Sequence, residues 1–264
     1  MRKIIAICCI LCVSANLALA ETIVIDSPSA TSVIGSDSTG NTITVNAKVD
    51  GHVFGSETSN AVSSENNTVT IHSEVTSAVH GGQVSSMDGG SISGSVANNT
   101  LTVGSGANLS GSLHDGKEGV IGGEIKIGPA YSMTDAAVSG SVYGNTVEFQ
   151  AGSSQEQVIG GQILVDANSQ LSSLDITQDA EVKNNAINIS GGSISRDVYG
   201  GKIRVSNLAG NGNYAVNGTI SNNNVTFTDG ILTDQIVGGA LEVHDIDGSG
   251  NFNIDSDVTG NEVT

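Results

Sequence analysis

The residues with the clearest potential for chemistry lie near the end of the chain, in the stretch 245–251. Alternating carboxylates before a glycine turn are typical of the first half of a calcium-binding loop. The stretch lacks the glutamate that would close such a loop, and its counterpart one repeat earlier, 207–213, carries no carboxylate. We interpret the segment as a plain turn and keep Asp245, Asp247 and Asn251 as a weak candidate metal site.

A basic pair, Lys202 and Arg204, flanks Ile203 in a pattern similar to the basic cluster of pectin-cleaving β-helices. Such enzymes need clustered carboxylates, or an arginine beside calcium-binding aspartates, on neighbouring coils. No aspartate pair recurs here, and the equivalent positions in earlier copies are 162–164 and 124–126, with different residues. We therefore expect Lys202 to be an ordinary outward-facing residue that tolerates substitution. A secreted polysaccharide lyase or hydrolase remains the alternative function.

No other group of residues forms a catalytic pattern. No Gly-x-Ser-x-Gly sequence precedes a helix, and the histidines are scattered without the spacing of metal ligands, so we expect them on surfaces or in turns. They are His52, His72, His80, His114 and His244. The sequence predicts a non-enzymatic protein with no catalytic residues and no cofactor.

A sequence repeat determines the fold that positions any functional side chains of this chain. The repeat motif begins with an apolar residue, followed by any residue, two Gly/Asn residues and any residue. Alternating apolar positions come next. The first apolar residue after each Gly/Asn pair falls at Ile43, Val69, Val84, Leu101, Ile125, Val147, Ile163, Ile187, Ile203, Val225, Leu241 and Val263. In the later copies, asparagine-bearing and Gly-Gly units alternate, so a full repeat of 38 to 40 residues contains two half-units.

The repeat predicts an all-β fold. Period-2 alternation of valine and isoleucine is typical of strands with one buried face, and 35 glycines argue against helices. We predict a parallel β-solenoid over 41–264, with one half-unit per coil and about twelve coils, giving a rod about 55 Å long. Residues 21–40 are expected to form an irregular N-terminal edge or cap. Six repeat positions are expected to share one continuous core: Val147, Ile163, Ile187, Ile203, Val225 and Leu241.

The Gly/Asn pairs are predicted to be tight bends, because both residues tolerate left-handed backbone conformations. We assign this structural role to Asn99, Asn145, Gly160, Gly161, Asn185, Gly200, Gly201, Asn223, Gly238 and Gly239. Stacked asparagines could also form an amide ladder. With one half-unit per coil, equivalent asparagines would stand about 9.6 Å apart, which is too far for contact. A backbone role is therefore favoured over a ladder.

Residues 1–20 have the pattern of a secretory signal peptide. Arg2 and Lys3 precede an apolar core, and the small residues at positions 18 and 20 form a cleavage site before Glu21. The segment is too short for a spanning helix. All three cysteines, at positions 8, 9 and 12, lie within it. The exported chain therefore depends on its stacked core rather than on disulfides.

The net charge of the chain restricts the classes of molecule that it can bind. The formal net charge is −18, and removal of the two basic residues of the signal makes it more negative. Such a charge disfavours nucleic acid and anionic lipid. Aromatic residues make up only 3% of the chain, with no tryptophan, which disfavours a stacking platform for sugars.

The stretches 66–71, 98–103, 191–195 and 197–201 resemble the degenerate Gly/Asn-rich repeats of bacterial autotransporter passengers. The resemblance covers about residues 35 to 264. It implies a passenger segment of an adhesin at the surface of a Gram-negative bacterium, or a secreted one. Its loops would contact a host surface or another copy, and 206–218 and 244–256 vary most. The C-terminal membrane barrel of that family is missing, and the chain stops within a motif, so we expect truncation.

The signal generates the first prediction. Export with cleavage after Ala20 should give a protein whose N-terminal sequencing begins at Glu21. A retained N-terminus that carries lipid on Cys8 or Cys12 would contradict it.

Overall fold

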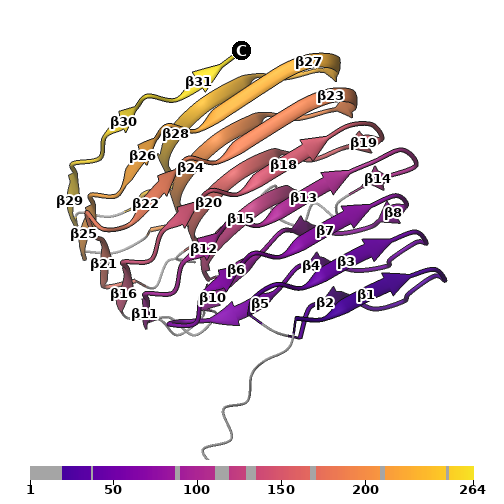
Figure 1. Cartoon of the computed structure of the whole chain (residues 1–264). Coiled ribbons are helices and arrows are strands. Elements are labelled where there is room, and N and C mark those ends of the chain that lie inside the picture. The colour runs from indigo at the N-terminus through magenta and orange to yellow at the C-terminus, as the bar shows by residue number, and fades with distance from the viewer. Residues whose placement is uncertain are drawn as a thin grey trace, which may run out of the picture.

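The computed structural model describes residues 20–36, 38–86, 90–110, 119–128, 135–166, 171–208, 212–247 and 250–264. All regular elements of these residues are β-strands, and neighbouring strands run parallel. The strands form four curled sheets that stack along one direction (Figure 1). The predicted all-β class with parallel, solenoid-like stacking is confirmed. The expected signal peptide, apart from Ala20, lies outside the described residues.

Two of the sheets are large. The eleven-stranded sheet contains β1 (Thr22–Ile25), β3 (Thr42–Val45), β7 (Thr68–Ile71), β8 (Glu74–Val75), β13 (Thr100–Val103), β14 (Asn108–Leu109), β18 (Thr146–Phe149), β19 (Ser153–Ser154), β23 (Ala186–Ile194), β27 (Asn224–Leu232) and β31 (Glu262–Val263). The nine-stranded sheet contains β2 (Val33–Ile34), β4 (Val53–Phe54), β5 (Glu57–Ser59), β9 (Val79–His80), β10 (Gln83–Ser86), β15 (Val120–Ile127), β20 (Val158–Asp166), β24 (Val198–Ser206) and β28 (Ile236–His244).

Two smaller sheets complete the later coils. The five-stranded sheet contains β11 (Gly90–Ile92), β16 (Asp135–Val138), β21 (Ser173–Ile176), β25 (Asn213–Val216) and β29 (Asn251–Ile254). The six-stranded sheet contains β6 (Ser64–Glu65), β12 (Val96–Ala97), β17 (Val142–Tyr143), β22 (Glu181–Lys183), β26 (Thr219–Ser221) and β30 (Val258–Thr259). A coil such as β22-β23-β24-β25 gives one strand to each of the four sheets.

One coil corresponds to the full repeat and not to the half-unit. Val147 pairs with Ile187, 40 residues away, while Ile163 pairs with Ile203 in a different sheet. The prediction of one half-unit per coil, and with it the count of twelve coils, is therefore wrong. Among the described residues, the path β1-β3-β7-β13-β18-β23-β27-β31 has eight strands. It spans about 34 Å at a strand spacing of about 4.8 Å.

The irregularity expected for the edge or cap at 21–40 is not found in its described residues, whose strands β1 and β2 end their sheets. β1 pairs with β3 over its full length, and β2 pairs with β4, so this segment forms a regular first coil.

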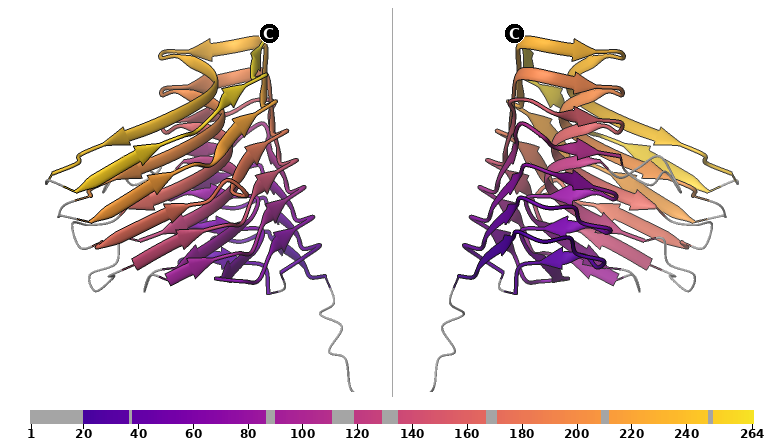
Figure 2. Two further views of the ribbon diagram at one scale, coloured as in Figure 1. Left: turned by 90° about the vertical axis from the view of Figure 1, so that its left-hand side faces the viewer. Right: turned by 90° about the vertical axis from the view of Figure 1, so that its right-hand side faces the viewer.

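The core is divided in two. Val147, Ile187 and Val225 pack in one cluster, between the eleven-stranded sheet and the first halves of the long strands of the nine-stranded sheet. Ile163 and Ile203 pack in a second cluster, against the five- and six-stranded sheets, and Leu241 lies partly buried beside them. The expected inward positions are confirmed, but they serve two cores rather than one. The coils correspondingly show two arms that diverge from one edge of the stack (Figure 2).

A buried row of asparagine side chains runs along the stack between the two cores. Each Nδ2 donates to Oδ1 of the next asparagine at 2.8–3.0 Å, and each backbone N–H donates to the same oxygen at 2.9–3.1 Å. The row comprises Asn41, Asn67, Asn99, Asn145, Asn185, Asn223 and Asn261. Because one coil is the full repeat, these residues occupy adjacent coils. The predicted preference for a backbone role over an amide ladder is wrong.

The left-handed conformation belongs to the residue before each ladder asparagine. Asn184 and Asn222 have φ angles of 54° and 55°, and Gly144 and Gly260 hold the same place with 66° and 64°. Asn99, Asn145, Asn185 and Asn223, predicted as turns, lie directly before β13, β18, β23 and β27, and none of them has a positive φ angle. Each doublet therefore combines a bend at its first position with a ladder amide at its second.

The Gly-Gly pairs are not bends either. Gly160–Gly161, Gly200–Gly201 and Gly238–Gly239 lie inside β20, β24 and β28, without positive φ angles. A Cβ on Gly201 would lie 2.4 Å from Nδ2 of Asn223, and one on Gly200 would lie 2.4 Å from the carbonyl oxygen of Gly238. Glycine is required there because the ladder and the next coil approach the backbone directly.

Three consecutive asparagines test this assignment. Asn223→Ala removes the acceptor of two buried donors of Asn185, so it should lower the free energy of unfolding by about 3 kcal/mol. The exposed neighbour gives a matched control, since Asn224→Ala should change it by less than about 0.5 kcal/mol. Asn222→Ala should cost about 1 kcal/mol from its left-handed conformation, while Asn222→Gly should cost nothing.

Urea unfolding followed by circular dichroism measures all four variants. Equal losses for Asn223→Ala and Asn224→Ala would show that the ladder contributes nothing to stability.

Candidate functional site

The weak calcium candidate does not assemble into a cluster. Oδ2 of Asp245 lies 2.7 Å from Nδ1 of its neighbour His244, and Nδ2 of Asn251 donates to Oδ1 of Asn213 at 3.0 Å. In the part of the chain that the structure describes, no three His, Cys, Asp or Glu side chains gather as metal ligands would. Two residues of the stretch, 248 and 249, lie outside that part.

The segments expected to be free loops are partly structural. Residues 206–218 contain β25, and 244–256 contain β29, both in the five-stranded sheet. Tyr214 is only 4% exposed, and its hydroxyl donates to the carbonyl oxygen of Leu171 at 2.8 Å. Phe252 packs on it, with 5.9 Å between the ring centroids. The extra length of these half-units therefore builds a core wall as well as connections.

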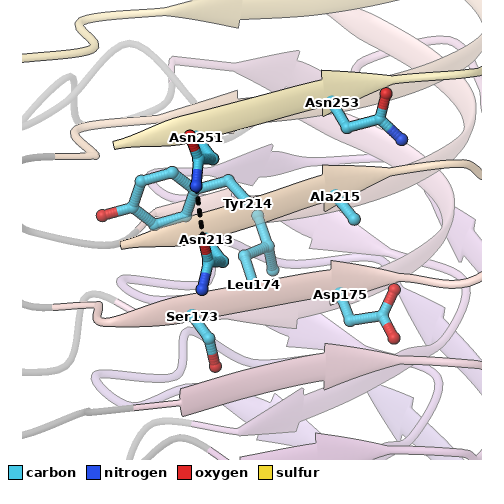
Figure 3. Close-up of a pocket in the computed structure, with 8 residues that line it drawn as sticks. All are labelled: Ser173, Leu174, Asp175, Asn213, Tyr214, Ala215, Asn251 and Asn253. Carbon is cyan, nitrogen blue, oxygen red and sulfur yellow. Dashed lines mark hydrogen bonds between the residues drawn. The ribbon is translucent and has the colours of Figure 1, made fainter. Parts of the chain in front are cut away.

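The outer face of this sheet carries a depression of about 350 Å³ (Figure 3). It spans β21, β25 and β29, which belong to three successive coils. Its outward-facing lining residues are Ser173, Asp175, Asn213, Ala215, Asn251 and Asn253. Strand pairing arranges them in two rows, Ser173-Asn213-Asn251 and Asp175-Ala215-Asn253.

The two rows differ in how their polar groups are used. In the first, Asn251 donates to Asn213, and Oγ of Ser173 donates to Oδ1 of Asp135 at 2.6 Å. In the second, the small side chain of Ala215 separates Asp175 from Asn253, and both of these are exposed. The second row thus holds a gap between a carboxylate and an amide.

A second polar row is buried, on the face of the nine-stranded sheet that points away from the two cores. Equivalent positions are occupied by Gln83, Glu124, Gln162 and Lys202. The register of Lys202 with Gln162 and Glu124 is as predicted, but its expected outward exposure is wrong, because Lys202 is 0% exposed.

Hydrogen bonds link the first part of this row. Both glutamines donate to Glu124, Gln83 at 2.5 Å and Gln162 at 2.7 Å. Nδ1 of His80 lies 3.4 Å from the same carboxylate, and its ring packs on Phe54 in a tilted arrangement, with 4.8 Å between the ring centroids. The prediction of a surface or turn position is wrong for His80, which is buried in β9. His114 lies outside the described residues.

The other end of the row holds an ion pair between Lys202 and Glu242. Nζ of Lys202 lies 2.9 Å from Oε2 of Glu242 and 4.0 Å from the ring centroid of Tyr199. Burial lowers the pKa of Lys202, although Glu242 opposes this effect. Burial alone would raise the pKa of Glu242, but the interactions with Lys202, Tyr199 and Arg204, of which those with Lys202 are the largest, together lower it. Burial and Glu242 raise the pKa of Tyr199.

These contacts link the two halves of the bent strands. Tyr199 precedes the glycine pair of β24, whereas Lys202 follows it. Ile121, Ile159 and Tyr199 form a small third cluster on the same face, against which Val237 and Ala240 pack. The buried polar row therefore lies at the bend of the nine-stranded sheet and is closed to solvent, whereas the depression on the outer face of the five-stranded sheet is open.

Four residues of the candidate site in this depression, Asn213, Ala215, Asn251 and Asn253, lie in the variable segments 206–218 and 244–256 that the sequence singled out, whereas Ser173 and Asp175 were not singled out. The sheet rows that these residues form were not recognised. Their signal is the alternation within 173–176, 213–216 and 251–254, which recurs at the full-repeat spacing of 38 to 40 residues. Treating the half-unit as the coil concealed it, because these stretches then counted as loop insertions.

Comparisons with family models, curated proteins and solved structures find no match to this chain. The described part of the chain holds no apolar helix of membrane-spanning length.

The buried ion pair generates a pH prediction. Glu242→Gln leaves the Lys202 ammonium without its counter-charge and should lower the free energy of unfolding at pH 7 by about 2 kcal/mol. The folded-state pKa of Glu242 lies below its ordinary value of 4.5, so its contribution is present above that value and is lost as pH falls through the folded pKa. The difference between wild type and variant should therefore narrow on acidification.

Urea unfolding between pH 7 and pH 3 measures this difference. Glu57→Gln, which removes the same charge at an exposed position, should cost less than about 0.5 kcal/mol throughout. A penalty for Glu242→Gln that does not depend on pH would contradict the assignment.

Proposed function

We propose that the chain is a non-enzymatic, exported repeat protein, the passenger segment of an autotransporter-type adhesin, whose outer faces make contacts for adhesion or aggregation. The signal pattern and the repeats that resemble such passengers support export to the surface of a Gram-negative bacterium or release from it.

One observation carries this proposal. Successive ladder asparagines are 26, 32, 46, 40, 38 and 38 residues apart, yet the hydrogen bonds between them are the same. The stack keeps its buried positions fixed while the length of a coil nearly doubles. Scaffolds of this kind accommodate variation on their outer side and commonly use that side for contacts.

The proposed contact surface includes residues of the two segments expected from the sequence, but these residues belong to strands and not to free loops. Because 206–218 and 244–256 contain β25 and β29, shortening them would remove core residues such as Tyr214. The outer face of the five-stranded sheet, with its depression, is the better candidate. Its exposed side chains belong to the strands themselves, so they can be exchanged without changing a connection.

Cell adhesion tests the proposal. Beads coated with the exported protein should bind host epithelial cells, or one another, more than uncoated beads do. The double substitution Asp175→Lys and Asn253→Lys should reduce this binding several-fold, because it places two cations on the contact face.

The control is Thr44→Lys with Thr70→Lys, which also places two lysines on an outer face, that of the eleven-stranded sheet, and raises the charge by two against three for the test variant. Thermal melting should confirm that both variants fold. Wild-type beads that bind neither cells nor each other would contradict the proposed function, and equal losses in both variants would contradict the choice of face.

A further inference from the structure

We infer that the depression on the five-stranded sheet binds an uncharged carbohydrate, with Ala215 as its floor and Asp175 and Asn253 as its polar walls. This inference rests on the proposed adhesive function and names the ligand class of the same face.

The gap has the dimensions of a small binding site. Asp175, Ala215 and Asn253 are direct neighbours on β21, β25 and β29. At about 4.8 Å between strands, the outer two stand about 9.6 Å apart with only a methyl group between them. The volume of about 350 Å³ falls at the lower end of the range for small-molecule pockets. One or two sugar rings are therefore the appropriate size of ligand.

The polar groups combine donors with acceptors. The carboxylate of Asp175 only accepts, whereas the amide of Asn253 both donates and accepts. Since Asn251 donates to Asn213, the oxygen of Asn251 and the amide hydrogens of Asn213 remain for a ligand. Sugar hydroxyls also donate and accept, so they match this mixture better than a ligand with only one of the two functions.

Charge restricts the ligand further. The lining contains no lysine or arginine, its single charge is negative, and the chain as a whole carries −18. Phosphorylated, sulfated and sialylated ligands are therefore disfavoured. A calcium ion would need several oxygen ligands with more than one carboxylate, and Asp175 is the only carboxylate of the lining.

The floor of the depression, Ala215, also suits a sugar ring. The methyl group of Ala215 offers an apolar contact to the C–H face of a ring, and among the lining side chains drawn in Figure 3 it alone lies between Asp175 and Asn253. The strands beneath are held by the core, where Leu174 and Tyr214 are buried. Two of the three strands of the site are therefore anchored before a ligand binds, which lowers the entropic cost of binding, whereas Phe252 of the edge strand β29 is only partly buried.

The experiment uses the exported protein on an array of immobilised oligosaccharides, with neutral glucose, galactose, mannose and N-acetylglucosamine glycans beside sialylated and sulfated ones. Binding to at least one neutral glycan is expected, unchanged by EDTA. Ligand-observed NMR with the same free glycan then measures the affinity.

Three substitutions locate the site. Asp175→Asn and Asn253→Ala should each weaken binding about tenfold. Ala215→Gln should abolish binding by filling the gap. Ala137→Gln provides the control, because Ala137 lies in the same row on β16, next to Asp175 but outside the depression. It should bind as the wild type does.

Three results would overturn the inference: no neutral glycan bound at millimolar concentration, binding only to charged glycans, or full binding by Ala215→Gln. Adhesion to cells by a protein that binds no neutral glycan would leave the proposed surface role standing and reject the ligand class. Glycan binding by a protein that does not adhere to cells would reject the adhesive role alone.

Discussion

The asparagine ladder is the interaction on which the rest of the structure depends. Each buried amide bonds to the coil on either side, so every coil must place an asparagine at the same height and angle. The opposite side of the coil must then approach with no side chain, and this requirement explains the glycine pairs. The apolar core is divided into two, because the cross-section of each coil is narrow where the asparagine meets the glycine pair.

The ladder also explains how a stack whose described residues include no cysteine keeps its register. A slip by one residue would turn a ladder asparagine out of the row and leave buried donors without acceptors, at a cost of about 1–3 kcal/mol for each group. Apolar residues alone specify register less strictly, since valine, isoleucine and leucine replace one another at equivalent positions, as at Val147 and Ile187. The polar row thus supplies specificity that the two cores lack.

Much of this fold can be predicted from the sequence. Period-2 alternation identifies the strands, and the equivalence of Lys202 with Gln162 is correct, because both depend on local spacing. The coil length was not predictable in the same way. In the sequence, an asparagine half-unit and a Gly-Gly half-unit look like two successive coils. In the structure, the close approach of Asn223 to Gly201 shows that the asparagine and the glycine pair face each other across the narrow part of adjoining coils. The error in coil length then concealed the candidate site, whose rows need the full-repeat register.

The ladder also sets the unit in which a chain of this kind can change during evolution. A duplication or deletion that carries one asparagine, one glycine pair and their strands leaves every remaining amide with a partner. A change of half that length would place a glycine pair where an asparagine is required and interrupt the row. Variation in the number of coils should therefore arise by recombination between whole repeats, whereas single coils can lengthen outside the ladder and glycine positions, as the 46-residue step from Asn99 to Asn145 illustrates.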